Sequence, residues 1–155
     1  RQQQFLRNVA WGDVDFLILD LPPGTGDIQL TIVQTAELDG VVVVTTPQEV
    51  ALIDARKAIG LFERVETPIL GVIENMSYFQ CPSDGKIYHI FGEGGGEREA
   101  AKLGVPLLGK IPLDIATRSG GDEGRPVALE DPEKNPVSAA FRQVAEQCAR
   151  VVLDR

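Results

Sequence analysis

The stretch Phe16-Leu-Ile-Leu-Asp-Leu-Pro-Pro-Gly-Thr-Gly-Asp27 decides how the rest of this chain is interpreted. Its first four residues are apolar on both faces, which is typical of a strand buried on both sides of a parallel sheet. Ligands of open α/β sheets bind beyond the carboxyl ends of such strands. Asp20 stands at that point, so we expect it to hold Mg²⁺ or its water.

The turn after this aspartate has two interpretations. Gly24 and Gly26 leave backbone N–H groups free to approach a phosphate, and Pro22 and Pro23 stiffen the backbone. Asp27 is placed to cap the helix that follows. The alternative is an ordinary strand-to-helix turn, in which Pro, Gly and Asp are common. This stretch alone does not decide between the two.

Strands and helices alternate through the rest of the chain. Three further apolar runs have the length of strands, at residues 41–44, 69–73 and 107–111. Residues 29–36 are a short helix candidate, and a longer helix is indicated by apolar residues at steps of three and four, at Leu52, Ala55, Ile59 and Phe62. A closing amphipathic helix is predicted after Pro136, with its stripe at Val137, Phe141, Val144, Cys148 and Val151. The alternation predicts an α/β fold with a mainly parallel sheet flanked by helices.

One segment breaks this alternation. Residues 78–91 place apolar and aromatic side chains on both sides of a Pro-Ser-Asp-Gly turn, which predicts a small β-hairpin excursion around Cys81. A lone Cys is a weak metal signal, because zinc and iron–sulfur sites take about four ligands. Cys81 is therefore either one ligand of a site shared by two chains or a contact residue. Cys148 is predicted to fill the core, and His89 to be a surface or strand residue.

Polar residues follow the predicted strands at one end of the sheet. Asn75 ends the third strand, where its amide suits the edge of a purine, although Asn is also common in strand-ending turns. Residues 112–114 follow the fourth strand. Because the carboxyl ends of parallel strands share one edge, we expect Asp20, residues 45–48, Asn75 and residues 112–114 to line one rim.

Composition limits the possible functions. The 155 residues include 23 Asp and Glu against 15 Lys and Arg, a net charge of −8, which argues against binding to nucleic acid. No apolar run approaches the roughly 20 residues of a membrane span. The two cysteines cannot form a disulfide framework, so a cytoplasmic location is expected.

The chain contains no G-x-x-x-x-G-K-[ST] sequence. Its Gly-rich strings around residues 94–96 and 120–121 are acidic and lack the lysine that reaches the β- and γ-phosphates, and we predict them to be flexible points. The chain alone therefore cannot form a P-loop.

Six motifs occur in an order that resembles a known family; they are Phe16-Leu-Ile-Leu-Asp-Leu-Pro-Pro-Gly-Thr-Gly-Asp27, Thr45-Thr-Pro-Gln-Glu49, Glu74-Asn-Met-Ser-Tyr-Phe79, Cys81-Pro82, Ile90-Phe-Gly92 with Gly94-Gly-Gly96, and Ile111-Pro-Leu-Asp114. The family is that of the Mrp-type iron–sulfur cluster carrier ATPases, similar to the MinD/ParA branch of P-loop NTPases with a deviant Walker A loop. The resemblance implies that residues 1–155 are the C-terminal portion of a single P-loop ATPase domain, with the Walker A loop upstream, and that this fragment alone is inactive.

The resemblance also implies residue roles. Asp20 would be the Walker B aspartate near Mg²⁺, and Asn75 would read adenine, with Pro112 and Asp114 beside it. The residues of the switch that senses the γ-phosphate would be Pro22, Pro23, Gly24, Thr25, Gly26 and Asp27.

Cys81 would be the first cysteine of the family's Cys-Pro-x-Cys, which bridges a [4Fe–4S] cluster across a homodimer. Here the chain departs from the family, because Asp84 stands where the second cysteine belongs. Two chains would offer two thiolates rather than four, with Asp84 as a harder oxygen donor.

The expected function is that of an ATP-dependent iron–sulfur cluster carrier or assembly protein. Its expected partners are a second copy, an iron–sulfur scaffold and apo client proteins. One alternative is a MinD/ParA-like positioning or regulatory ATPase without a cluster. Another is a dimerisation or scaffold module that does not bind nucleotide.

Overall fold

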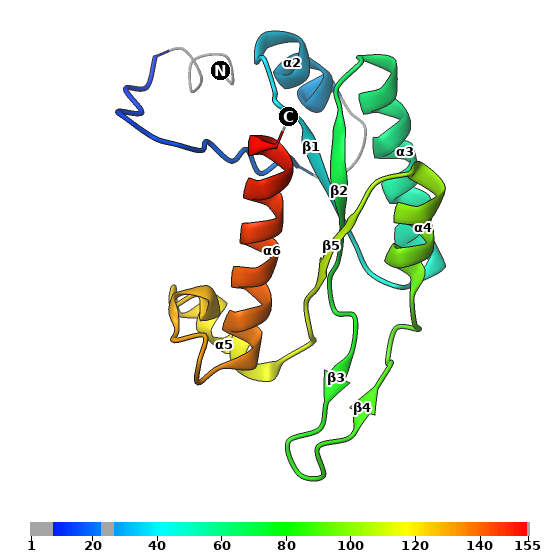
Figure 1. Cartoon of the computed structure of the whole chain (residues 1–155), viewed down its shortest axis with the longest axis vertical. Helices are drawn as coiled ribbons and strands as arrows, with labels where there is room; N and C mark the ends of the chain where they lie inside the picture. Colours follow the sequence, from blue (N-terminus) through cyan, green and yellow to red (C-terminus); the bar gives the residue numbers. More distant parts are fainter. Residues whose placement is uncertain (1–7, 23–26, 155) are drawn as a thin grey trace.

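A three-stranded parallel sheet forms the centre of the computed structural model, which describes residues 8–22 and 27–154. The strands are β1 (Val41–Thr45), β2 (Ile69–Glu74) and β5 (Leu107–Lys110), in the order β1-β2-β5. Helices α3 (Glu49–Arg64) and α4 (Gly95–Leu103) lie on one face, and α6 (Pro136–Leu153) lies on the other (Figure 1). The remaining helices are α2 (Asp27–Thr35), α5 (Ile115–Asp122) and the short 3-10 helix η1 (Val127–Leu129). This architecture confirms the predicted α/β fold with its parallel sheet.

Helix α3 shows how the sequence pattern becomes packing. All four residues of its predicted stripe are buried: Leu52, Ala55, Ile59 and Phe62. Ala55 and Ile59 pack with Val43 of β1 and Val72 of β2 in the main core. Val72 is fully buried, because the central strand is covered by helices on both faces. Burial of these apolar side chains is the main force that holds the helix on the sheet.

Residues 16–19 do not form the strand that we predicted. The segment has no regular secondary structure, and three of its four apolar side chains are exposed, Ile18 to 88%, while Leu19 is half-buried. A strand needs a hydrogen-bonded neighbour, and within the described residues β1 pairs with β2 alone. The prediction of a buried strand is therefore wrong for this structure, because an apolar pattern does not provide the partner strand that would cover it.

The predicted hairpin is present. Strands β3 (Phe79–Gln80) and β4 (Ile87–Tyr88) pair antiparallel and project beyond the carboxyl edge of the sheet (Figure 1). A tight turn joins them, in which the Gly85 N–H donates to the carbonyl of Cys81 at 2.8 Å. Gly85 has a φ of 71°, a conformation that glycine adopts without steric cost.

The Gly-rich strings are not the flexible points that we predicted. Gly95 and Gly96 begin α4, and Gly120 and Gly121 lie within α5. Tertiary contacts here outweigh the low helix propensity of glycine. Among the described helices, none is both long enough and apolar enough to cross a membrane.

Candidate functional site

Three strand ends meet at the carboxyl edge of the sheet, and hydrogen bonds beyond the strands hold them together. The Asn75 N–H donates to the carbonyl of Thr45 at 2.7 Å, which ties the end of β2 to the end of β1. The Ile111 N–H donates to the carbonyl of Glu74 at 2.9 Å, which ties the exit of β5 to β2. The structure thus brings residues 45–48, Asn75 and residues 112–114 to one rim, as expected from a parallel sheet.

Asn75 has a defined orientation at this rim. Its side-chain oxygen accepts a hydrogen bond from the Met76 N–H at 3.0 Å. Met76 has a φ of 50°, so the backbone turns sharply directly after the strand. The amide is half-buried, and its carbonyl end faces its own backbone.

Asp114 caps a helix. Its Oδ2 accepts from the Thr117 N–H at 2.7 Å and from the Thr117 hydroxyl at 2.8 Å, so it begins α5 as an N-cap. Pro112 precedes it and is half-buried. Sequence reasoning placed both residues at the rim but did not foresee the capping role, because α5 itself was not predicted.

Asp20 is exposed, and the described contacts do not join it to the rim. The carbonyl of Pro22 accepts from the side chain of Gln29 at 2.5 Å, which ties the start of the turn to α2. Pro23, Gly24, Thr25 and Gly26 lie outside the described residues. Asp27 is the first residue of α2, and only its backbone is described.

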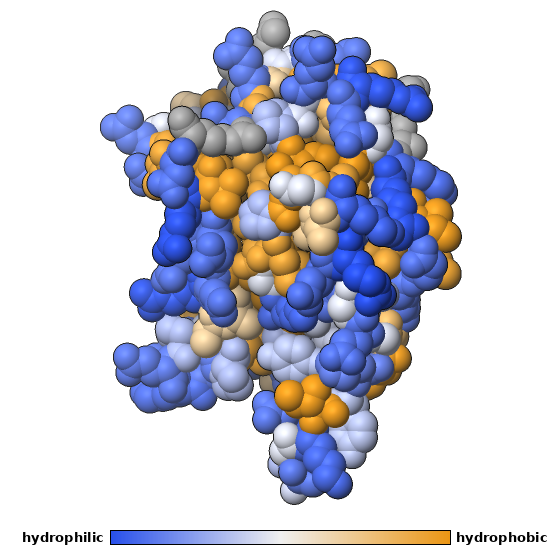
Figure 2. Space-filling model, turned by 45° about the vertical axis from the view of Figure 1, so that its right-hand side comes forward, coloured by the Kyte–Doolittle hydropathy of each residue, from blue (hydrophilic) through white to orange (hydrophobic). Residues whose placement is uncertain are grey.

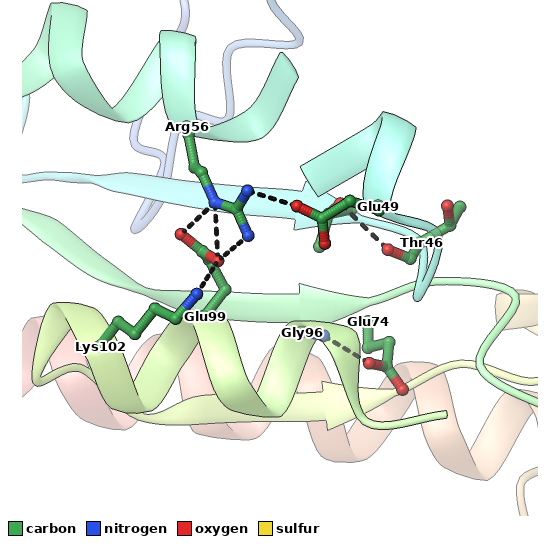
Figure 3. Close-up of polar contacts among 8 residues, drawn as sticks. Thr46, Glu49, Arg56, Glu74, Gly96, Glu99 and Lys102 are labelled. Carbon is green, nitrogen blue, oxygen red and sulfur yellow. Dashed lines mark hydrogen bonds and ion pairs between the residues drawn. The ribbon is translucent and has the colours of Figure 1, made fainter. Parts of the chain in front are cut away.

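Sequence reasoning missed the buried carboxylate at the end of β2. Glu74 is 0% exposed. Its Oε1 accepts from the Ser77 hydroxyl at 2.5 Å. Its Oε2 accepts from the Gly96 N–H at 2.6 Å (Figure 3). The signal available in the sequence was a glutamate that directly continues an apolar run, where a charged side chain needs partners.

Close packing explains why glycines begin α4. A Cβ on Gly95 would lie 2.4 Å from the carbonyl oxygen of Pro47, and a Cβ on Gly96 would lie 3.0 Å from the Cβ of Glu74. The backbone of the Gly-rich segment therefore presses against both the rim after β1 and the end of β2.

An ion-pair network joins α3 to α4 (Figure 3). The guanidinium of Arg56 binds both oxygens of the buried Glu99, at 2.8–3.0 Å, and also binds Glu49 at 2.6 Å. Lys102 lies 3.6 Å from Glu99 on the next turn of α4. The hydrogen bonds from Arg56 hold the pKa of Glu99 below its ordinary value.

Both cysteines are half-buried, so Cys148 is not the core residue that we predicted, but the pKa values of the two thiols are shifted in opposite directions. Cys81 lies beside the turn of the hairpin, with its Sγ 3.0 Å from the Ser83 hydroxyl, and this contact lowers the pKa of the thiol. Burial on α6 raises the pKa of Cys148 instead. A thiolate, the form that binds iron, is thus favoured at Cys81.

Asp84 occupies the same turn as Cys81. Its Oδ1 accepts from the Lys86 N–H at 3.0 Å, and this bond lowers the pKa of the carboxyl group. In the described part of the chain, no group of three or more His, Cys, Asp or Glu side chains is arranged to hold a metal ion.

A parallel sheet covered by helices on both faces, with polar residues at its carboxyl edge, is the architecture of nucleotide-binding α/β proteins. The family model described as "ParA: NUBPL iron-transfer P-loop NTPase" matches residues 2–149, and the chain belongs to this family. The MinD-like fold predicted from the resemblance is thereby confirmed.

Two relatives illustrate the similarity. The iron-sulfur cluster carrier protein of Deinococcus radiodurans is 53% identical over 149 residues, covering 95% of this chain and 41% of that protein. The protein of the same name from Pyrococcus furiosus is 50% identical over 145 residues, which cover 94% of this chain and 48% of that protein. The chain therefore spans about half the length of the curated relatives that it matches.

Two solved structures are also similar. The nucleotide-binding protein of Archaeoglobus fulgidus in complex with ADP has a TM-score of 0.71 and 44% identity, over 79% of this chain and 51% of that chain. The septum site-determining protein MinD of Pyrococcus horikoshii, complexed with Mg-ADP, has a TM-score of 0.67 and 26% identity, over 95% and 55%.

Proposed function

We propose that residues 1–155 are the C-terminal portion of a single P-loop ATPase domain whose full-length protein carries iron–sulfur clusters to apo client proteins. The observation that carries this proposal is the placement of Cys81, whose thiol pKa is lowered, on a hairpin rooted in the rim of a nucleotide-binding fold. Two relatives named iron-sulfur cluster carrier proteins support this proposal, because they are 53% and 50% identical to this chain over nearly its whole length.

ATP is proposed to bind across the rim. The buried Oγ1 of Thr46, next to the end of β1, has no hydrogen-bond partner among the described residues, and a ligand atom at the rim would satisfy it. We assign adenine contacts to Asn75, with Pro112 and Asp114 beside it. Helix capping by Asp114 is compatible with this role, because the cap fixes the backbone of residues 112–114.

The phosphate side is proposed to involve Asp20 and the residues 22–27. Asp20 would hold Mg²⁺, which neutralises charge on the phosphates as ATP is hydrolysed. Residues 22–27 would act as the switch that senses the γ-phosphate, since their glycines leave N–H groups free to donate. The Lys of a Walker A loop is not among these residues, so this chain supplies only part of the phosphate site.

The cluster is the cargo. We propose that Cys81 from each of two chains binds a shared [4Fe–4S] cluster, with Asp84 as an additional oxygen ligand. The hairpin also presents apolar surface for a second chain, a scaffold or a client, because Ile87, Tyr88 and Ile90 are all about half exposed. Figure 2 shows hydrophobic surface on this projecting part of the molecule.

Transfer of a cluster tests this function. The full-length protein, loaded with iron and sulfide under anaerobic conditions, is mixed with an apo iron–sulfur protein, with and without Mg-ATP. We expect ATP hydrolysis by the carrier and appearance of the cluster absorbance in the client. A protein that hydrolyses ATP but retains no iron would instead support a MinD/ParA-like regulatory ATPase. The presence of Asp84 in place of the family's second cysteine is the observation that favours this alternative.

A further inference from the structure

Glu74 contacts three parts of the molecule: the nucleotide rim, the root of the Cys81 hairpin and the start of α4. Its backbone ends β2 directly before Asn75, one carboxylate oxygen holds Ser77 at the root of the hairpin, and the other holds Gly96 at the start of α4. No other described residue is shown to bind both the hairpin root and α4 through its side chain. We infer that Glu74 is a positioning residue that couples the Cys81 hairpin to the nucleotide rim, an inference that rests on the proposed function.

Burial makes these contacts strong. Glu74 is fully buried, and Ser77 is 3% exposed, so water does not compete for either bond. The two hydrogen bonds, of 2.5 and 2.6 Å, are at the short end for their types, as expected of a carboxylate acceptor. Oε2 also faces the N-terminus of α4, where the helix dipole favours a carboxylate.

The hairpin has few other anchors at its root. The Ser77 N–H donates to the carbonyl of Ile111 at 2.9 Å, and the Leu113 N–H donates to the carbonyl of Tyr78 at 2.7 Å. Both of these bonds attach the hairpin to residues 111–114, which belong to the same rim. A shift of the rim on nucleotide binding therefore reaches the hairpin root both through this backbone and through the buried bond from Ser77 to Glu74.

The Gly-rich segment is the third connection. Gly95 lies against Pro47, which follows β1, and Gly96 lies against Glu74, so the start of α4 packs between the ends of β1 and β2. Movement of residues 45–48 would push on the start of α4 and, through the Gly96 N–H, on the carboxylate that holds Ser77. The geometry thus connects two sides of the rim to one side chain.

The test compares hydrogen exchange in the full-length protein with and without Mg-ADP. In the wild type we expect Mg-ADP to change the exchange of amides in residues 77–90 by about fivefold or more, the low end of coupling between two sites. Ser77→Ala removes the bond to the hairpin and keeps the bond to Gly96. It should bind Mg-ADP as the wild type does, while most of the change in the hairpin is lost, because only the backbone bonds to residues 111–114 still link the hairpin to the rim.

Glu74→Leu is the second variant, because leucine has a similar volume but offers no acceptor to the Ser77 hydroxyl or to the Gly96 N–H. The expected result is the same loss of response. Ser138→Ala is the matched control, since Ser138 is equally buried but its hydroxyl donates to the carbonyl of Glu130, at 2.7 Å, away from the hairpin. The control should keep the wild-type response.

A wild-type response in Ser77→Ala overturns the inference, as does a hairpin that does not respond to Mg-ADP in the wild type although the nucleotide binds. A wild-type protein that does not bind Mg-ADP contradicts the proposed function, and the coupling with it. If Glu74→Leu does not fold, the comparison of Ser77→Ala with Ser138→Ala decides the question alone.

Discussion

Among single residues, Asp20 is the one whose replacement we expect to slow ATP turnover most. Asp20→Asn keeps the size of the side chain and removes the charge that would position Mg²⁺. Turnover by the full-length protein should fall about tenfold or more, or about 1.4 kcal/mol in the activation barrier. Steady-state ATPase assays at saturating Mg²⁺ check this. Unchanged turnover would remove Asp20 from the site, and Asp54→Asn, an exposed position on α3, is the control.

Glu99 predicts a dependence of stability on pH. Its pKa in the folded protein lies below the ordinary value of 4.5, because Arg56 binds the charged form. The stabilisation is therefore complete above pH 4.5 and is lost as the pH falls through the lower, folded pKa. Between about pH 6 and 3, the free energy of unfolding should fall more steeply in the wild type than in Glu99→Gln.

Urea denaturation of the full-length protein at several pH values measures this difference. Glu97→Gln is a suitable control, since Glu97 lies on the same helix but is mostly exposed. Equal slopes for the wild type and Glu99→Gln would show that the ion pair with Arg56 does not contribute.

At the scale of elements, α4 depends on the glycines at its start. Gly95→Ala would place a Cβ 2.4 Å from a backbone oxygen, so the helix or the rim must shift. We expect a loss of about 1–3 kcal/mol in the free energy of unfolding. Gly60→Ala is the matched control, because nothing lies within 4 Å of its Cβ and it sits inside α3. That variant should gain about 0.5–1 kcal/mol. Equal effects in denaturation would contradict the close packing.

The sequence predicted those helices and turns whose residue pattern is determined by local geometry. The stripe of α3 and the Pro-Ser-Asp-Gly turn of the hairpin lead directly to the observed structure, because each pattern reflects local geometry. Helix α4 was not predicted, because the glycines at its start have a low helix propensity. Contacts with Pro47 and Glu74 hold this helix in place instead. The strand predicted at residues 16–19 is absent, because burial of a strand depends on partner strands, and the sequence of the segment itself does not reveal whether they are present.

The sequence likewise predicted only part of the candidate site. Convergence of Asn75 and residues 112–114 follows from the parallel sheet, so the sequence sufficed. The role of Glu74 depends on donors 3 and 22 positions further along the chain, and no local pattern relates Glu74 to Gly96. Asp20 remains a prediction from its motif alone.

For the molecule as a whole, we predict that the isolated 155-residue chain binds ATP weakly or not at all. The backbone N–H groups and lysine of a P-loop supply most phosphate contacts, and this sequence contains no such loop. Titration calorimetry with Mg-ATP measures the affinity. A micromolar dissociation constant for the isolated chain would show that the rim alone is sufficient.

The central claim, that the Cys81 hairpin holds the cluster, is tested most directly by the iron and sulfide content of the full-length protein after anaerobic reconstitution. Cys81→Ser should abolish the cluster, and Cys148→Ser should keep it, because burial on α6 disfavours the thiolate of Cys148. Asp84→Cys, which restores the spacing of the family, should increase retention. If Cys81→Ser binds as much iron as the wild type, the hairpin is not the cluster site and serves only as a contact surface.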